Sequence, residues 1–336
     1  MLSLLITALA LGVDAEPQAR LDPAELGVPF QRYTTSDALG RTITFYLSLP
    51  ANSQGDAKLP VALIIPGSGC QSLFQKRGEQ ISGGQQTLLC RVCKGRVRVL
   101  AVEKPGVKFL DAPARPGSAE GSAEEFRAEH TLPRWAEANV AALRAVWTLP
   151  NIDTSRTLVV GHSEGGIVAA RIAATLPNVT HVASLAGGGP TQLFSLAESR
   201  TQARANDKPG DSAARLQKFY EEWSAVQKTP DSPTAMWLGH PHRRWTSFLA
   251  TSVTQELLRT KARVFVAQGG RDTSVPPTGH HVLVAELKSQ GHSPTVAYLE
   301  DADHSFNKPD VAPASPDGLL AMFGQVLDWF LEQQPN

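Results

Sequence analysis

Short apolar runs recur along the chain, and most of them end at glycine or at polar turn residues. Residues 59–65 (LPVALII) form a continuous apolar run that ends at Pro66-Gly67. Such a run is typical of a strand buried on both faces, as in a parallel sheet. Comparable runs predict further strands at residues 41–49, 96–102, 157–160, 181–185, 263–267 and 295–299.

Between these runs, apolar residues recur at helical spacing. Val140, Leu143 and Val146 lie on one face of a helix predicted over residues 132–148. Similar patterns predict helices at residues 163–175, 279–290 and 319–331. Strands that alternate with helices indicate βαβ units. The predicted fold class is therefore α/β, with a mostly parallel central sheet flanked by helices.

Residues 191–258 interrupt this alternation. The pattern there predicts two helices, at residues 212–226 and 246–258, and few strands. We expect this stretch to be a helical cap insertion over the carboxyl edge of the sheet, where open α/β sheets bind their ligands. The predicted core then comprises residues 16–190 and 259–336.

Composition narrows the classes of partner. The chain has 336 residues, of which 42% are apolar and 19% charged, so it can form a sizeable core. The 32 basic residues balance the 32 acidic residues, which gives no electrostatic reason for nucleic acid or an anionic membrane to be the main partner. A small organic substrate is the expectation.

The amino terminus has the pattern of a secretory signal peptide. Residues 2–13 are an apolar run too short to span a bilayer, and Val13-Asp14-Ala15 is a small-residue cleavage site. We expect residues 1–15 to be a signal peptide and the protein to be periplasmic or secreted. The first basic residue is Arg20, after the run, so a short N-terminal helix of a cytoplasmic protein is the alternative.

The chain contains three cysteines, Cys70, Cys90 and Cys93. Residues 90–93 form a CxxC, but no second pair completes a zinc site. In an exported protein, two of the three cysteines would form a disulfide. Their spacing leaves the pairing open.

The strongest motif is Gly161-His162-Ser163-Glu164-Gly165, which follows the strand at 157–160 and begins a helix. G-x-S-x-G between a strand and a helix predicts a nucleophile elbow. The serine sits on a turn sharp enough to lift its hydroxyl clear of the sheet. The flanking residues are small because the strand and helix backbones crowd together there, and the helix N-terminus faces the reacting centre.

The motif in this context resembles the α/β-hydrolase superfamily of esterases, lipases and related serine hydrolases. That resemblance implies a triad in the order serine, acid, histidine. Asp272 and His304 follow the strands at 263–267 and 295–299, so both lie at strand carboxyl ends. Asp301 and Asp303 are alternative acids, and Asp303 is poorly placed because it adjoins His304.

Residues 66–69 (PGSG) follow the buried strand at 59–65 and resemble the oxyanion loop of the same superfamily. The family usually has histidine and glycine there, and Pro66 takes the place of the histidine. The resemblance implies an oxyanion hole formed by the backbone amides of Glu164 and of Ser68 or Gly69. Only backbone groups are involved, so a plain tight turn is compatible with the same residues.

Other polar and aromatic residues carry weaker signals. Trp237 and Trp245 are candidates to line the substrate pocket, or alternatively form the core of the cap. The histidines in 240–242 and 280–281 lack matched ligands, so no metal is predicted. Arg243-Arg244 is expected to be an exposed charge pair. The chain lacks a glycine-rich nucleotide loop after a strand, and no cofactor is predicted.

The sequence thus predicts an exported serine hydrolase that cleaves small carboxylic esters through an acyl-enzyme. Ser163 would attack the carbonyl, His304 would transfer the proton, and Asp272 would orient the imidazole. A peptidase, amidase or thioesterase on the same fold is one alternative. A binding protein that keeps this fold without catalysis is another. The oligomeric state is left open.

Overall fold

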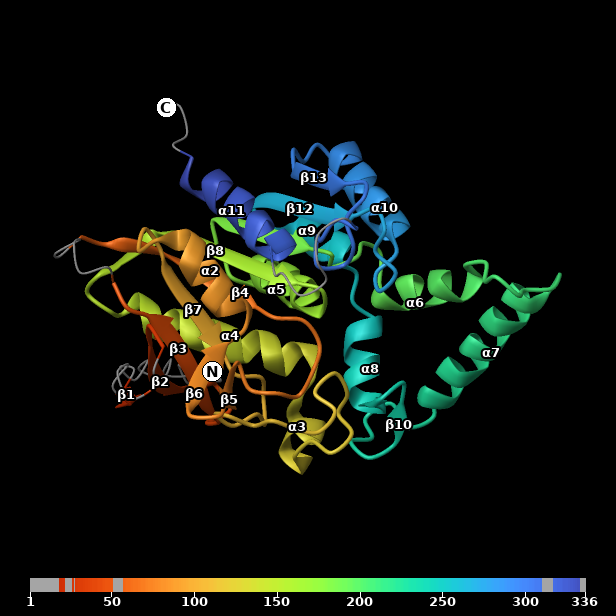
Figure 1. Cartoon of the computed structure of the whole chain (residues 1–336), viewed down its shortest axis with the longest axis horizontal. Helices are drawn as coiled ribbons and strands as arrows, with labels where there is room; N and C mark the ends of the chain where they lie inside the picture. Colours follow the sequence, from red (N-terminus) through yellow and green to blue (C-terminus); the bar gives the residue numbers. More distant parts are fainter. Residues whose placement is uncertain (1–17, 22–25, 27, 51–56, 310–316, 333–336) are drawn as a thin grey trace, which may run out of the picture.

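The structure is a computed structural model that describes residues 18–21, 26, 28–50, 57–309 and 317–332 (Figure 1). Within these residues, nine strands form one sheet. Their order across the sheet is β1 (Gln18–Leu21), β2 (Phe30–Ser36), β3 (Thr42–Ser48), β7 (Arg98–Val102), β4 (Leu59–Ile65), β8 (Ile152–His162), β9 (His181–Leu185), β12 (Arg263–Gly269) and β13 (Thr295–Leu299). From β7 to β13 every neighbouring pair is parallel, whereas β1, β2 and β3 pair antiparallel. The predicted mostly parallel sheet is confirmed.

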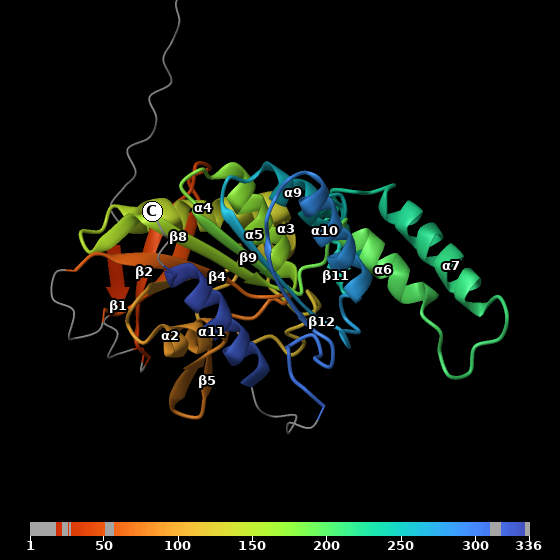
Figure 2. The same cartoon turned by 90° about the horizontal axis from the view of Figure 1, so that it is seen from above.

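Strand β4 explains why the sheet is covered on both faces. All seven of its residues are buried, and they alternate between two apolar clusters: Val61, Leu63 and Ile65 face one, and Ala62 and Ile64 the other. Figure 2 shows helices above and below the sheet. The first cluster includes residues of α4 (Leu132–Trp147), α5 (Glu164–Thr175), α9 (Val253–Arg259) and α10 (Pro277–Ser289), and the second includes residues of α2 (Gln85–Cys93) and α11 (Asp317–Leu331).

Besides α2, three short elements between β4 and α4 were not predicted from the sequence. Strands β5 (Phe74–Arg77) and β6 (Gln80–Gly83) form an antiparallel hairpin, and helix α3 (Glu124–Glu129) precedes α4. The hairpin strands have four residues each and are mostly polar, so the apolar alternation that identifies a strand is missing. The hairpin nevertheless forms one wall of the candidate site.

The insertion contains α6 (Gln192–Thr201), α7 (Asp211–Val226), the short strands β10 (Met236–Trp237) and β11 (His240–Pro241), and α8 (His242–Leu249). In Figure 1, α6 and α7 project from the body of the molecule. The helix expected at 246–258 is two helices, α8 and α9, and the side chain of Ser252 caps α9 by accepting from the amide of Gln255. Helix α9 packs on α5 in the core. The division of the chain at residues 190 and 259 stays a prediction.

The predicted signal peptide at residues 1–15 lies outside the described residues, so export stays a prediction. Among the helices of the described ranges, none is both long and apolar enough to cross a membrane. All three cysteines carry free thiols, with Cys70 and Cys93 buried. The disulfide expected for an exported chain is therefore not formed in this structure.

His181 on β9 is buried and titrates unlike a free histidine. Its side chain is hydrogen-bonded to the Thr180 hydroxyl at 2.8 Å and meets the rings of Trp329 and Phe330 edge-on. Burial, together with nearby arginines, lowers the pKa of His181 to about 4. Because the unfolded chain binds its proton more tightly, the contribution of neutral His181 to stability is lost as the pH falls from 6.5 towards 4.

Replacing His181 with glutamine, which keeps a hydrogen-bonding side chain but does not titrate, is expected to flatten this response. As the pH falls from 6.5 to 4, wild type should lose about 1.4 kcal/mol of unfolding free energy per pH unit relative to His181→Gln. Urea unfolding followed by circular dichroism at several pH values measures it. If the unfolding free energies of the two proteins changed in parallel with pH, the lowered pKa of His181 would be contradicted.

Candidate active site

Ser163 occupies a strained turn between β8 and α5. Its backbone has φ 57° and ψ −125°, a conformation that non-glycine residues rarely adopt. A Cβ on Gly161 would overlap the carbonyl oxygen of Gly165, and a Cβ on Gly165 would overlap that of Ile65. The glycines of the motif are therefore required because three backbone segments meet at this point.

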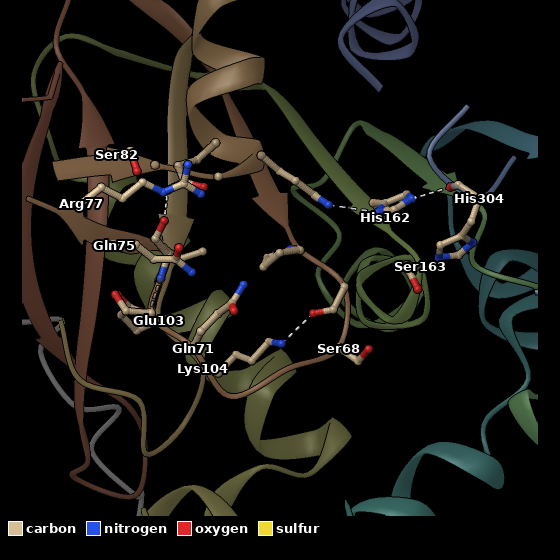
Figure 3. Close-up of a pocket in the computed structure, with 18 residues that line it drawn as sticks. Ser68, Gln71, Gln75, Arg77, Ser82, Glu103, Lys104, His162, Ser163 and His304 are labelled. Atoms are coloured by element: carbon tan, nitrogen blue, oxygen red, sulfur yellow. Dashed lines mark hydrogen bonds between the residues drawn. The ribbon is translucent and has the colours of Figure 1, made fainter. Parts of the chain in front are cut away.

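The structure brings two of the predicted side chains together and places the third beside them. His304 Nδ1 lies 2.7 Å from Asp272 Oδ2. His304 and Ser163 line the same cavity, and Figure 3 shows the imidazole beside the serine hydroxyl. Asp303, one of the two alternative acids, instead accepts hydrogen bonds from the backbone amides of Ser305 and Asn307 within its own loop.

Asp272 is held as a carboxylate by four hydrogen bonds. Oδ1 accepts from the amides of Ser274 and Val275, both at 2.8 Å, and Oδ2 accepts from Gln268 Nε2 at 2.8 Å as well as from His304. Burial opposes ionisation, but these donors and the histidine outweigh it and hold the pKa of Asp272 below its usual value. A fixed carboxylate on Nδ1 leaves the opposite nitrogen of the His304 ring free to act as a base.

His162, the variable residue of the motif before the serine, supports the His304 loop. Its Nε2 donates to the backbone carbonyl of His304 at 2.9 Å, and its Nδ1 accepts from Gln85 Nε2 at 3.0 Å. Burial, followed by the neighbouring His304, lowers the pKa of His162 to about 4, so the ring is neutral. This chain of contacts ties the loop of His304 to the serine turn, and the sequence offered no sign of it.

The loop at residues 66–69 lies against the serine, as the resemblance implied. A Cβ on Gly67 would lie 3.2 Å from Ser163 Cβ and 3.6 Å from its Oγ. The amides of Ser68 and Glu164, the implied oxyanion donors, thus belong to segments that adjoin the hydroxyl. Lys104, at the end of β7, donates to the carbonyls of Gly67 and Gly69 from behind the loop.

The side chain of Glu164 lies in a buried ion pair rather than in solvent. It is bonded to Arg244 of α8, and Nε2 of His130 lies 3.2 Å from its other oxygen. Arg244 is 1% exposed and stacks over Trp245 and Phe248, with its guanidinium carbon 3.9 Å and 4.7 Å from the ring centroids. The expectation of an exposed arginine pair is wrong for Arg244, because this carboxylate and these rings compensate its burial.

A cavity of about 460 Å³ opens beside Ser163 and is mostly polar (Figure 3). Besides the serine and the two histidines, its wall comes from the oxyanion-type loop, residues 71–73, the β5–β6 hairpin, the start of α2 and the two residues after β7. The polar residues of this wall are Ser68, Gln71, Ser72, Gln75, Arg77, Ser82, Gln85, Gln86, Glu103 and Lys104.

Trp237 and Trp245 are not among the residues that line this cavity. They pack on each other with ring centroids 5.4 Å apart and belong to the apolar cluster of the insertion. The prediction that they line the pocket is therefore corrected for this cavity. Sequence reasoning missed the polar wall because its residues come from short elements without a periodic pattern.

In the described part of the chain, no group of three or more histidine, cysteine or acidic residues is arranged to hold a metal ion. His240 and His280 are buried at 5% and 3% exposure, and burial is the main cause that lowers the pKa of each to about 4. These histidines are neutral packing residues.

A family model of the alpha/beta hydrolase family matches residues 63–316, a span that contains the serine turn and both of its partners. The chain belongs to the alpha/beta hydrolase family. No curated protein matches the sequence. The fold prediction is thus confirmed by the sheet and by the family match together.

Solved structures of similar fold include both esterases and peptidases. Est1E from Butyrivibrio proteoclasticus, solved with ferulic acid, aligns with a TM-score of 0.54 at 17% identity, over 87% of this hydrolase and 96% of that chain. Acylaminoacyl peptidase from Pyrococcus horikoshii aligns with a TM-score of 0.59 at 12% identity, over 92% and 43%. Dipeptidyl peptidase 4 from Porphyromonas gingivalis gives 0.57 at 14% identity, over 89% and 35%. This hydrolase therefore spans less than half the length of these two peptidases.

Loss of the buried arginine is expected to destabilise this hydrolase strongly. Arg244→Met leaves the Glu164 carboxylate buried without its cation, and should lower the unfolding free energy by about 3–5 kcal/mol in urea titrations. Arg243→Met, next to it on α8 but less buried, should change stability by less than about 0.5 kcal/mol. Adding Glu164→Gln to Arg244→Met should recover most of the loss, and failure to recover it would contradict a compensating pair.

Proposed function

We propose that this hydrolase cleaves small carboxylic esters through an acyl-enzyme on Ser163. The observation that carries the proposal is the fixed hydrogen bond between Asp272 and His304, on a ring that lies beside the serine hydroxyl. A serine hydroxyl is a weak nucleophile until an imidazole takes its proton, and the imidazole needs an acceptor on its other nitrogen. The bond to Asp272 and the position of the ring beside the hydroxyl support this role for His304.

In the proposed reaction, Ser163 attacks the ester carbonyl as His304 takes its proton. The amides of Ser68 and Glu164 stabilise the negative charge on the carbonyl oxygen. His304 then protonates the alcohol, which leaves, and the acyl group remains on the serine. His304 next takes a proton from water, which attacks the acyl-enzyme, and the acid is released with Ser163 restored.

The environment of Glu103 favours an ester over a peptide with a free amino group. Among the cavity-lining residues, Glu103 is the one with a carboxyl group, and Asp272 lies outside that set. Both oxygens of Glu103 are taken: Oε1 accepts from Tyr46 at 2.9 Å and Ser72 at 2.6 Å, and Oε2 accepts from the amide of Leu73 at 3.2 Å. Burial raises the pKa of Glu103 to about 7. It is a poor partner for a substrate ammonium group.

Labelling with a fluorophosphonate and turnover of matched nitrophenyl esters, thioesters and nitroanilides test this function. Wild type should be labelled and should hydrolyse the ester fastest, whereas Ser163→Ala should lose labelling. Asp272→Asn should lower kcat by about four orders of magnitude, because the imidazole loses its tautomer and orientation. Faster anilide or thioester turnover would favour a peptidase, amidase or thioesterase. Absence of labelling in folded wild type would favour a non-catalytic binding protein.

The polar wall points to an ester whose remote part is polar rather than a fatty acyl chain. Gln75 and Arg77 line the cavity, whereas Lys76 between them does not, since side chains alternate along a strand. Lys76 lies 3.6 Å from Glu79 in an ion pair, and Arg77 has no ion pair among the described residues. A carboxylate on the substrate would give the guanidinium of Arg77 its partner.

Comparison of the nitrophenyl monoester of glutaric acid with nitrophenyl valerate tests this preference, because the two acyl chains have the same length. Wild type should favour the glutarate ester in kcat/KM, and Arg77→Ala should reduce that preference by about tenfold, the loss of a charged hydrogen bond. Lys76→Ala removes the same charge from the same strand outside the cavity and should leave the preference unchanged. An equal effect of both substitutions would refute a specific contact.

A further inference from the structure

Lys104 is a buried cation that the proposed reaction does not use. It follows strand β7, is 6% exposed, and lies over the ring of Trp135 with Nζ 4.7 Å from the centroid. Its Nζ donates to the carbonyl of Gly67 at 2.6 Å and to the carbonyl of Gly69 at 2.8 Å. Burying a lysine ammonium group costs folding free energy unless hydrogen bonds replace those it made to water. Both carbonyls belong to the loop that adjoins Ser163.

These two hydrogen bonds determine which way the loop amides point. The described peptide bonds are trans, and in a trans peptide group the carbonyl and the N–H point in opposite directions. The Gly67 carbonyl faces Lys104, so the Ser68 N–H of the same peptide group faces away from it. Figure 3 shows Lys104 and Ser163 on opposite sides of the loop. The Ser68 amide is therefore directed to the side of the nucleophile.

The second carbonyl determines the direction of the Cys70 amide, two residues after Ser68. Gly69 C=O faces Lys104, and the N–H of the same peptide group, that of Cys70, donates to the carbonyl of Pro116 at 2.9 Å. That amide is therefore used within the fold. Of the two loop amides implied by the sequence, the contact at the Gly67 carbonyl orients that of Ser68, whereas the Gly69 amide shares its peptide group with the Ser68 carbonyl, which Lys104 does not contact.

The other proposed oxyanion donor, the amide of Glu164, is anchored in the same buried group of charges. The Glu164 carboxylate is held by Arg244 and His130, and burial together with the charges of Lys104 and Arg244 lowers the pKa of His130 well below its usual value. Neutral His130 then donates from Nε2 to the carboxylate. Lys104 and Glu164 thus contact the two segments that carry the donors, and both side chains are buried.

We propose that Lys104 is a positioning residue that holds the loop at residues 66–69 with the Ser68 amide aimed at the oxyanion. The inference rests on the proposed function, because an oxyanion forms only if Ser163 attacks a carbonyl. The hydrogen bonds do not depend on the charge of the lysine. Burial and the nearby Arg244 lower the pKa of Lys104 to about 7, and a neutral amine still has two N–H groups for the two carbonyls.

Lys104→Met tests the inference, because methionine fills similar space without a donor. We expect kcat per active site, counted by fluorophosphonate titration, to fall by about tenfold to a hundredfold, with KM changed less than about twofold. The inhibition constant of a trifluoromethyl ketone, which binds as a tetrahedral adduct, should rise by the same factor as kcat/KM falls. Lys104→Arg, which keeps N–H donors, should restore part of kcat.

Lys108→Met is the matched control. Lys108 lies with Lys104 in the loop after β7 but is exposed, so this variant should behave as wild type. If kcat per titrated site in Lys104→Met equals that of the control, Lys104 acts only on stability and the inference is overturned while the proposed function stands. The same holds if ketone affinity is unchanged. If wild type is neither labelled at Ser163 nor active on esters, the proposed function fails and this inference with it.

Discussion

The close approach of three backbone segments at Ser163 is the constraint on which the candidate site depends. The end of β8, the start of α5 and the loop after β4 leave no room for a side chain at Gly161 or Gly165. Parallel strands bring their carboxyl ends to one edge of the sheet, so the loops after β12 and β13 reach the same place with Asp272 and His304. A strained serine at the centre of this edge needs packing from every side to stay in its conformation.

Much of that support is polar and buried, which is unusual for the interior of a protein. Glu164, Arg244, His130 and Lys104 form charged or polar contacts behind the serine turn and the oxyanion-type loop, and aromatic rings cover both cations. The free energy lost by removing these charges from water is offset only if all partners are present. Arg244 comes from α8 of the insertion and Glu164 from α5 of the core, so this pair also joins the two parts of the chain.

Some residues of the cavity wall, such as Gly67, Lys104 and His162, also support the serine turn or the loop beside it, and others come from a separate segment. The outer wall of the cavity is the β5–β6 hairpin, whose alternate side chains Gln75 and Arg77 face inward. The tryptophans of the insertion are packed against one another and leave this wall polar. The hairpin therefore adds polar side chains to the cavity from a segment outside the serine turn.

The sequence by itself determined the alternation of strands and helices, the position of the serine turn, and the strand ends that carry Asp272 and His304. These features are local, because burial on two faces, helical spacing and tight glycine turns all leave a pattern within a few residues. The sequence also favoured Asp272 over Asp303 as the partner of the imidazole, and the structure places it there. Tertiary structure alone decided that Arg244 is buried against Glu164 and that Lys104 donates to the loop at residues 66–69. Each of these outcomes depends on residues far apart in the chain, where no local pattern records which side chains will meet.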